Sequence, residues 1–243
     1  MQVYVKKSFL DKNIQDNSNE FNLDIVHTIP LSKYYFIYDK NGLSFVRDSE
    51  NPKEILNINF LKGKLGWRLK RANHETKLKK ALGKAKGPLN IFDATAGLLS
   101  DSMIFLSLGH SVVAVEQSKI IYLLLKDAIR RAKDAIPFLS NIKLINGNSI
   151  NVIKKIDTSF DIIYLDPMYP ILKNNIKKSG ELSAIRSILA IEKLSSNEDS
   201  LINNFMGIDY KKIILKRPLK SKKIYSNINY QVKGRTTRFD IYL

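Results

Sequence analysis

The stretch Asp161-Ile-Ile-Tyr-Leu-Asp-Pro-Met-Tyr-Pro170 joins an apolar strand to a stiff polar loop. Residues 162–165 form a short run of strand-forming types, and the residues before Pro167 and Pro170 are pushed towards extended backbone. In open α/β sheets, ligands bind beyond the carboxyl ends of the strands, where this loop would lie. A carboxylate, backbone carbonyls and an aromatic ring there suit recognition of the amino group of a planar base. The alternative is an ordinary strand end followed by a proline-rich turn.

The composition limits the classes of protein to which the chain can belong. Its 243 residues, 44% of them apolar, suffice for one large domain with or without a small attachment. The absence of cysteine excludes disulfides and thiolate metal sites, and the three histidines lie too far apart in sequence for a metal motif. The sequence has no signal-peptide core and no apolar run long enough to span a membrane. We therefore expect a soluble, cytoplasmic protein without a metal.

Positive charge predominates, with 40 Lys and Arg against 23 Asp and Glu and a net charge of +17. Such an excess attracts polyanions, and phosphate contacts supply most of the non-specific affinity for nucleic acids. Basic residues are dense between Lys62 and Lys86. A charge run is often only a solvated helix face, but here it precedes a domain expected to handle a base. Nucleic acid is therefore favoured as partner over an acidic membrane surface.

Residues 1–61 are expected to form a small β-rich unit. Its strongest signal is a hairpin of residues 34–38 and 43–47, in which Asn41 and Gly42 can both accept positive φ. The other expectations for this part of the chain are a loop over residues 11–20, a strand over 55–60 and one or two lead-in helices over 62–88.

Strands and helices alternate over residues 89–243, which predicts a Rossmann-like, mostly parallel sheet with right-handed crossovers. Two consecutive strands at the end of the chain, 224–232 and 236–243, predict an antiparallel hairpin at one edge of the sheet. This α/β layout resembles the class I methyltransferase fold. The other expected strands are 89–94, 111–116, 142–146, 161–165 and 211–216, and the expected helices are 102–108, 119–133, 152–156 and 176–194.

Polar residues end successive strands of this domain. Asp93-Ala-Thr-Ala-Gly97 lacks the Gly-x-Gly-x-x-Gly pattern of a pyrophosphate site, and its acidic residue suits the cationic methionyl group of S-adenosylmethionine. Glu116 ends the next strand, where a carboxylate can accept both ribose hydroxyls of an adenosine. Asn148 and Ser149 follow the third strand, where an adenine amine would need an acceptor. Each of these residues alone could be a solvated loop residue, but together they favour a cofactor site.

Lys216, Arg217 and Pro218 end a further strand on the same rim. Arg217 could hold a phosphate in a bidentate manner, although charges at a sheet edge can also serve to prevent aggregation. We favour the phosphate contact. The residues predicted to contact RNA are Lys62, Lys64, Arg68, Arg71, Lys216 and Arg217.

Several motifs occur in an order that resembles the RsmJ family of bacterial ribosomal RNA small-subunit methyltransferases. The motifs are Asp93-Ala-Thr-Ala-Gly-Leu98, Val115-Glu116, Tyr164-Leu-Asp-Pro-Met-Tyr-Pro170, Lys216-Arg-Pro218 and Arg238-Phe-Asp-Ile-Tyr242. The resemblance implies S-adenosylmethionine-dependent methylation of N2 of a guanine in 16S rRNA of the small ribosomal subunit. Besides Asp93, Ala94 and Gly97 of the first turn, the cofactor contacts implied by this resemblance are Ser100, Asp101, Glu116, Gln117, Asn148, Ser149 and Asp166.

The chain departs from the family pattern at two places. The family usually has Gly-Arg-Asp after the Gly-Leu of the first motif, whereas this chain has Leu99-Ser100-Asp101. Before the domain, the family carries a basic glycine-rich stretch, whereas this chain has Trp67-Arg-Leu-Lys-Arg-Ala-Asn-His74.

The catalytic residues are predicted to be Asp166, Pro167, Met168 and Tyr169. Asp166 and a carbonyl of the following loop would accept the N–H bonds of the target amine and orient it towards the sulfonium methyl group. Tyr169 would stack on the base, which must leave any helical stack to enter the pocket. Two alternatives stay open: an amino-methyltransferase acting on adenine or cytosine in another nucleic acid, and a non-catalytic RNA-binding assembly factor.

Overall fold

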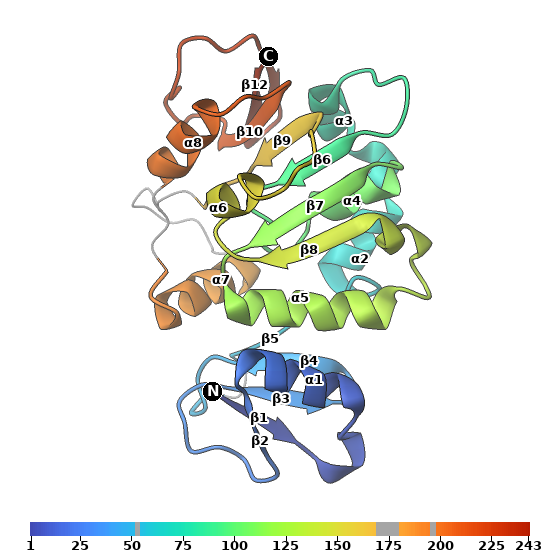
Figure 1. Cartoon of the computed structure of the whole chain (residues 1–243), viewed down its shortest axis with the longest axis vertical. Coiled ribbons are helices and arrows are strands. Elements are labelled where there is room, and N and C mark those ends of the chain that lie inside the picture. Colours follow the sequence, from blue (N-terminus) through green and yellow to red (C-terminus); the bar gives the residue numbers. More distant parts are fainter. Residues whose placement is uncertain (52–53, 169–179, 195–197) are drawn as a thin grey trace.

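Two β-sheets organise the computed structural model, which describes residues 1–51, 54–168, 180–194 and 198–243. A five-stranded sheet comes from the N-terminal residues and has the order β2-β1-β3-β4-β5. A seven-stranded sheet follows, with the order β11-β12-β10-β9-β6-β7-β8. Helix α5 (Lys119–Ala132) lies between the two sheets (Figure 1). Within the described residues, no helix is long and apolar enough to cross a membrane.

The predicted hairpin is present in the N-terminal sheet. Strands β3 and β4 pair antiparallel with Asp39 opposite Gly42, and Gly42 has a φ of 82°. Of the two residues that could accept a positive φ, only Gly42 has one. The strands of this sheet are β1 (Gln2–Val5), β2 (Asp24–Val26), β3 (Tyr35–Asp39), β4 (Gly42–Val46) and β5 (Ile55–Asn57).

The segment expected to be a loop is helix α1 (Lys12–Phe21), so that expectation was wrong. A side-chain oxygen of Asp11 accepts a hydrogen bond from the backbone N–H of Ile14 and caps the helix at its N-terminus. Asn22 ends the helix in the left-handed conformation, with a φ of 51°. The side chain of Ile14 is fully buried, so packing against the sheet stabilises a helix that its polar composition alone would not.

The larger sheet has the predicted topology. Its neighbouring strands β8, β7, β6, β9 and β10 are parallel, and β12 pairs antiparallel with both β10 and β11 at one edge. The strand order reverses at β6, which lies between β7 and β9, and such a switch point opens a crevice for ligands. The strands are β6 (Asn90–Asp93), β7 (Ser111–Glu116), β8 (Ile142–Asn146), β9 (Ile162–Leu165), β10 (Ile213–Pro218), β11 (Tyr230–Lys233) and β12 (Thr237–Tyr242).

Helices cover both faces of this sheet and form two separate cores. Helix α6 begins three residues before its expected start, α7 begins where the described residues resume, and α8 was not predicted. One face carries α2 (Gly63–Lys70), α3 (Thr76–Leu82), α4 (Ser102–Ser107), α5 and α7 (Gly180–Ile191). The other face carries α6 (Ser149–Ile153) and α8 (Glu198–Met206).

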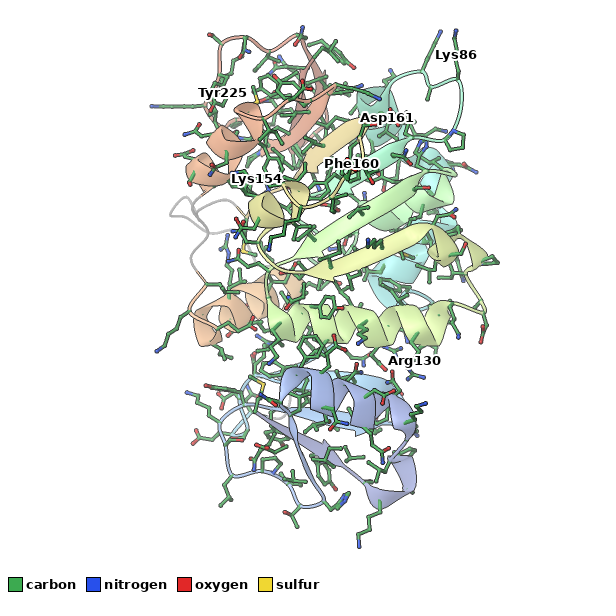
Figure 2. All side chains as sticks on the ribbon, in the orientation of Figure 1. Lys86, Arg130, Lys154, Phe160, Asp161 and Tyr225 are labelled. Carbon is green, nitrogen blue, oxygen red and sulfur yellow. The ribbon has the colours of Figure 1, made fainter. Side chains whose placement is uncertain are left out.

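A buried carboxylate on α5 joins the two sheets. Asp127, which is 1% exposed, accepts a hydrogen bond of 2.8 Å from the backbone N–H of Leu43 in β4. It also pairs with Arg130 and Arg131 of its own helix, and Arg131 donates to the carbonyl of Ile58 at 2.6 Å. Figure 2 shows Arg130 on α5 at its boundary with the N-terminal sheet. The hairpin of the smaller sheet is thus held directly against the larger domain.

Candidate active site

The carboxyl ends of the parallel strands meet along one rim of the larger sheet. Asp93 ends β6, Glu116 ends β7 and Asn146 ends β8, while Asp166 directly follows β9. Lys216 lies near the carboxyl end of β10, one residue after Leu215, which pairs with Leu165 of β9. The opposite rim carries Phe160 and Asp161, which Figure 2 shows before the start of β9. The structure therefore brings the predicted strand-end residues onto one side.

Asp93 is buried and stabilises the turn that follows β6. The side chain is 2% exposed, and its oxygens accept hydrogen bonds from the backbone N–H of Thr95 and the hydroxyl of Ser102. Burial raises the pKa of the Asp93 carboxyl to about 7, although these two hydrogen bonds favour the charged form. The turn continues through Gly97 and Leu99, which both have positive φ. Asp93 thus fixes the turn rather than projecting from it.

Glu116 connects this turn to the next one along the rim. Its two carboxylate oxygens accept hydrogen bonds from the backbone N–H groups of Gly97, at 2.9 Å, and Ser118, at 2.8 Å. The side chain is 7% exposed, and burial raises the pKa of its carboxyl to about 7. The nearby charges of Glu192 and Asp93 act in the same direction, whereas the two backbone hydrogen bonds act against it. Gly97 and Glu116, both predicted to contact the cofactor, are therefore in direct contact.

The next loop contains the remaining predicted cofactor residues on this side. Asn148 is exposed and caps α6, because its side-chain oxygen accepts from the backbone N–H groups of Ile150 and Asn151. Ser149 is buried, and Gln117 is exposed after the end of β7. The Asn148 side-chain oxygen is thus engaged by the helix that it caps.

A network of charges that the sequence did not reveal lies at the ends of β9 and β10. The Lys216 ammonium donates to a carboxylate oxygen of Asp101 at 2.7 Å and to one of Asp166 at 2.8 Å. The hydroxyl of Tyr164 also donates to Asp101, at 2.5 Å. Arg68 of α2 completes the network through its bond of 2.6 Å to the other oxygen of Asp101. Three segments distant in sequence, which contribute Arg68, Tyr164 and Lys216, therefore converge on Asp101.

The charges in this network stabilise one another. Burial opposes the charge on Asp101, but Lys216 and Arg68 lower the pKa of its carboxyl below the usual range. Burial likewise opposes the charge on Lys216, but Asp101 and Asp166 raise the pKa of its ammonium above the usual range. Burial raises the pKa of the Asp166 carboxyl, while the neighbouring Lys216 acts against this rise. Lys216 therefore favours the carboxylate form of Asp166.

The loop after β9 is fixed at its first residue. The backbone N–H of Asp166 donates to the hydroxyl of Thr95 at 2.7 Å, so the loop is anchored to the turn after β6. Pro167 is buried and Met168 is partly buried. Tyr169, predicted to stack on the base, lies outside the described residues. The part of the predicted catalytic loop that can be placed thus adjoins the predicted cofactor turn.

The residues predicted to contact RNA have different surroundings. Arg68 and Lys216 belong to the network around Asp101, and Arg68 also donates to the carbonyl of Ser100 at 2.8 Å. Arg217 is buried on the other face of β10, with Glu198 3.9 Å from its guanidinium. By contrast, Lys64 on α2 is exposed, as are Lys62 and Arg71 at the two ends of this helix.

Arg238, the first residue of the last sequence motif, is buried beside the loop that follows β10. Its guanidinium donates to the carbonyls of Pro218, Leu219 and Ser221, and it pairs with Asp240 at 2.9 Å. The residue thus fastens the loop after β10. The sequence identified Arg238 only as part of a family motif, and its hydrogen-bond partners could not be predicted from the sequence.

Comparisons with known proteins agree with this architecture. A family profile described as "Putative SAM-dependent methyltransferase" matches residues 19–243. The ribosomal RNA small subunit methyltransferase J of Desulfotalea psychrophila is 32% identical, over 85% of this chain and 82% of the relative. The protein of the same name from Francisella tularensis subsp. novicida is also 32% identical, over 97% of this chain and 95% of the relative.

A solved structure gives the same fold. The crystal structure of a SAM-dependent methyltransferase from Neisseria gonorrhoeae matches with a TM-score of 0.67 and 24% identity, covering 100% of this chain and 96% of that one. The parallel sheet and its antiparallel edge are thus those of a class I methyltransferase. The chain belongs to the family of S-adenosylmethionine-dependent methyltransferases that includes ribosomal RNA small subunit methyltransferase J, and its cofactor is S-adenosylmethionine.

Proposed function

We propose that this protein methylates the N2 amino group of a guanine in the 16S rRNA of the small ribosomal subunit, in the cytoplasm. The observation that carries the proposal is the Asp166 carboxylate at the switch-point rim, directly before Pro167 and Met168. Lys216 donates to this carboxylate, and the hydroxyl of Thr95 accepts from the backbone N–H of Asp166. The names of the curated relatives support a ribosomal RNA substrate. The net charge of +17 supports a polyanionic partner.

The residues of the rim fit the cofactor. The Glu116 carboxylate accepts two backbone hydrogen bonds, and a carboxylate has further lone pairs with which it would accept the ribose hydroxyls. Gln117, Asn148 and Ser149 would border the adenine, with the exposed Asn148 amide still able to donate from its nitrogen. The turn of residues 94–101 would hold the methionyl group. When bound, the cofactor supplies a methyl group already activated by its sulfonium charge.

The chain's own contribution to the reaction is orientation and electrostatics. The exocyclic amine of guanine is a weak nucleophile because its lone pair is delocalised into the ring. Asp166 would accept one N–H bond of the amine, and a carbonyl of the Pro167-Met168 segment would accept the other, so that the lone pair faces the methyl group. The carboxylate also stabilises the positive charge that develops on the amine. The methylated amine loses its surplus proton readily, so no strong base is required.

Methyl transfer from labelled cofactor tests the proposal. The purified protein is incubated with small ribosomal subunits or with naked 16S rRNA that lacks the modification, and the labelled nucleoside is identified after digestion. We expect N2-methylguanosine. A labelled adenosine or cytidine would contradict the proposed base and support the wider amino-methyltransferase alternative. An absence of cofactor binding in calorimetry would instead support a non-catalytic assembly factor.

A further inference from the structure

Trp67 is a large aromatic residue on the surface of α2. It is the chain's single tryptophan, and 62% of its surface is exposed. The guanidinium of Arg71, one helical turn further along, lies 5.0 Å from the centroid of the indole ring. A ring of this size is normally more buried, so its exposure calls for a reason beyond packing. The simplest alternative is that the ring only supports the Arg71 side chain.

Helix α2 adjoins the active site on its other side. Arg68, next to Trp67, donates to the carbonyl of Ser100 and to Asp101, which also binds Lys216. Lys64 pairs at 3.1 Å with Glu181 in the first turn of α7, where the described chain resumes after the catalytic loop. The helix that carries Trp67 is therefore tied to the turn after β6 on one side and to the start of α7 on the other.

The charges around Trp67 are those of a surface for polyanions. Exposed cations stand one helical turn before and after the ring, and residues 62–71 contain no acidic residue. Glu75, the next acidic residue, is paired with Arg68. Lys86, at the end of the same basic segment, lies instead on the loop after α3, towards the start of β6 (Figure 2). The exposed cations on α2 and at its two ends are Lys62, Lys64, Lys70 and Arg71, of which Lys64 pairs with Glu181.

We propose that Trp67, with Arg71, forms a stacking platform for an unpaired base of the RNA next to the nucleotide that is methylated. The inference rests on the proposed function, since it takes RNA as the substrate. An aromatic face among cations binds single strands through base stacking and phosphate contacts together. A protein partner would instead call for an apolar surround, and the neighbours of Trp67 on the exposed face are basic. The platform would hold the strand while the target base is turned into the site.

Tryptophan fluorescence tests the platform directly, because Trp67 is the only tryptophan and reports this site alone. The full-length protein is titrated with a single-stranded RNA oligonucleotide and, separately, with inorganic polyphosphate, a polyanion without bases. We expect the RNA to quench the fluorescence and polyphosphate to leave it nearly unchanged. RNA that binds, as followed by anisotropy of a labelled oligonucleotide, without any quenching would overturn the proposal and favour a protein contact for Trp67.

Substitutions give a second, independent readout. Trp67→Ala should weaken binding of the oligonucleotide about 5-fold to 150-fold, whereas Trp67→Phe should retain most of the affinity, because a phenyl ring still stacks. Leu31→Ala is the matched control, since Leu31 is fully exposed on the N-terminal unit. Equal affinities of Trp67→Ala and wild type would refute the platform. Failure of the proposed function can be distinguished from failure of the platform. A wild-type protein that methylates another nucleoside could still show quenching of Trp67 by RNA.

Discussion

The ammonium group of Lys216 bridges Asp101 and Asp166, at 2.7 Å and 2.8 Å, and so joins the start of α4 to the loop after β9. A matching pair stands at the other end of the same two strands, where Lys211 lies 3.0 Å from Asp161. The first pair is partly buried and lies beside the proposed cofactor turn, whereas the ammonium of the second is exposed. The two pairs allow an effect at the proposed active site to be separated from a general effect of charge.

Lys216→Met should slow methyl transfer about tenfold or more, because it leaves two carboxylates without their shared cation. Lys216 acts against the raised pKa of Asp166, so its loss should raise that pKa further. The fall in single-turnover rate that accompanies protonation of Asp166 should therefore occur at higher pH than in the wild type. Lys216→Arg should restore part of the rate, and Lys211→Met should change neither rate nor pH profile. An unshifted pH profile in Lys216→Met would contradict the positioning role.

Asp166→Ala should lower the single-turnover rate about a hundredfold or more, which is the usual effect of removing one oriented group at a reacting centre. RNA affinity should change little, because phosphate contacts dominate it. Asp166→Asn keeps the shape without the charge and should also be slow. Asp161→Asn is the control at the opposite end of β9. A near-normal rate for Asp166→Ala at saturating cofactor would rule out the proposed orientation of the amine.

The sequence predicted those parts of the site that depend on neighbours along the chain. Apolar runs placed the parallel strands, and the position of polar residues at their ends, such as Glu116 at the end of β7, could be predicted without a structure. The network around Asp101 could not be predicted, because it joins Arg68 and Lys216 from segments that only the fold brings together. Helix α1 was missed for a similar reason, since it depends on a capping Asp11 and on burial of one apolar residue rather than on a periodic pattern.

Glu116 should make cofactor binding depend on pH. Burial raises the pKa of its carboxyl to about 7, so the group is increasingly protonated below neutral pH and can then accept fewer hydrogen bonds. Affinity for S-adenosylmethionine in calorimetry should therefore be higher at pH 8 than at pH 6. Glu116→Gln should weaken binding by about 1.5–3 kcal/mol and remove most of the pH dependence, with buried Asp93 accounting for the remainder. A wild-type affinity that does not vary with pH would argue against the ribose contact.

At Leu99, an unfavourable backbone conformation is opposed by favourable packing of the side chain, and substitutions should show which contributes more to stability. It has a φ of 59°, in a region that favours glycine, yet its side chain is fully buried. Left-handed backbone costs a non-glycine residue about 1–2 kcal/mol, whereas removing a buried leucine side chain costs about 2–5 kcal/mol. Packing therefore outweighs strain, and Leu99→Gly should be less stable than wild type.

The comparison with alanine isolates the strain at this position. Leu99→Ala loses nearly the same packing, apart from one methyl group, but keeps the left-handed strain. Leu99→Gly should therefore be the more stable variant by roughly 0.5–1 kcal/mol after the greater flexibility of unfolded glycine is included. Urea unfolding of the two variants measures this difference. Alanine more stable than glycine would mean that the turn relaxes when the side chain is removed.

Asp127 should control the attachment of the N-terminal unit, which we propose spans residues 1–61. Its buried carboxylate accepts from Leu43 and pairs with Arg131, and a Cβ on Gly42 would lie 2.4 Å from one of its oxygens, so no larger residue fits between them. Asp127→Ala should destabilise the protein by about 2–4 kcal/mol, because it leaves a buried N–H and partly buried guanidinium groups without their acceptor. Asp134→Ala, at an exposed position just beyond α5, should have little effect.

Urea unfolding of Asp127→Ala, followed by two spectroscopic probes, shows which part of the protein the substitution destabilises. Trp67 fluorescence reports on α2, and far-ultraviolet circular dichroism reports on both sheets. If Asp127 fixes the unit to α5, the circular dichroism of the variant should fall at a lower urea concentration than the fluorescence signal, since the smaller sheet separates first. Cofactor affinity should be retained, because the Glu116 rim lies at the N-terminal end of α5, away from the Asp127 contact. Coincident transitions at the wild-type midpoint would show that the hairpin is held by its apolar contacts alone.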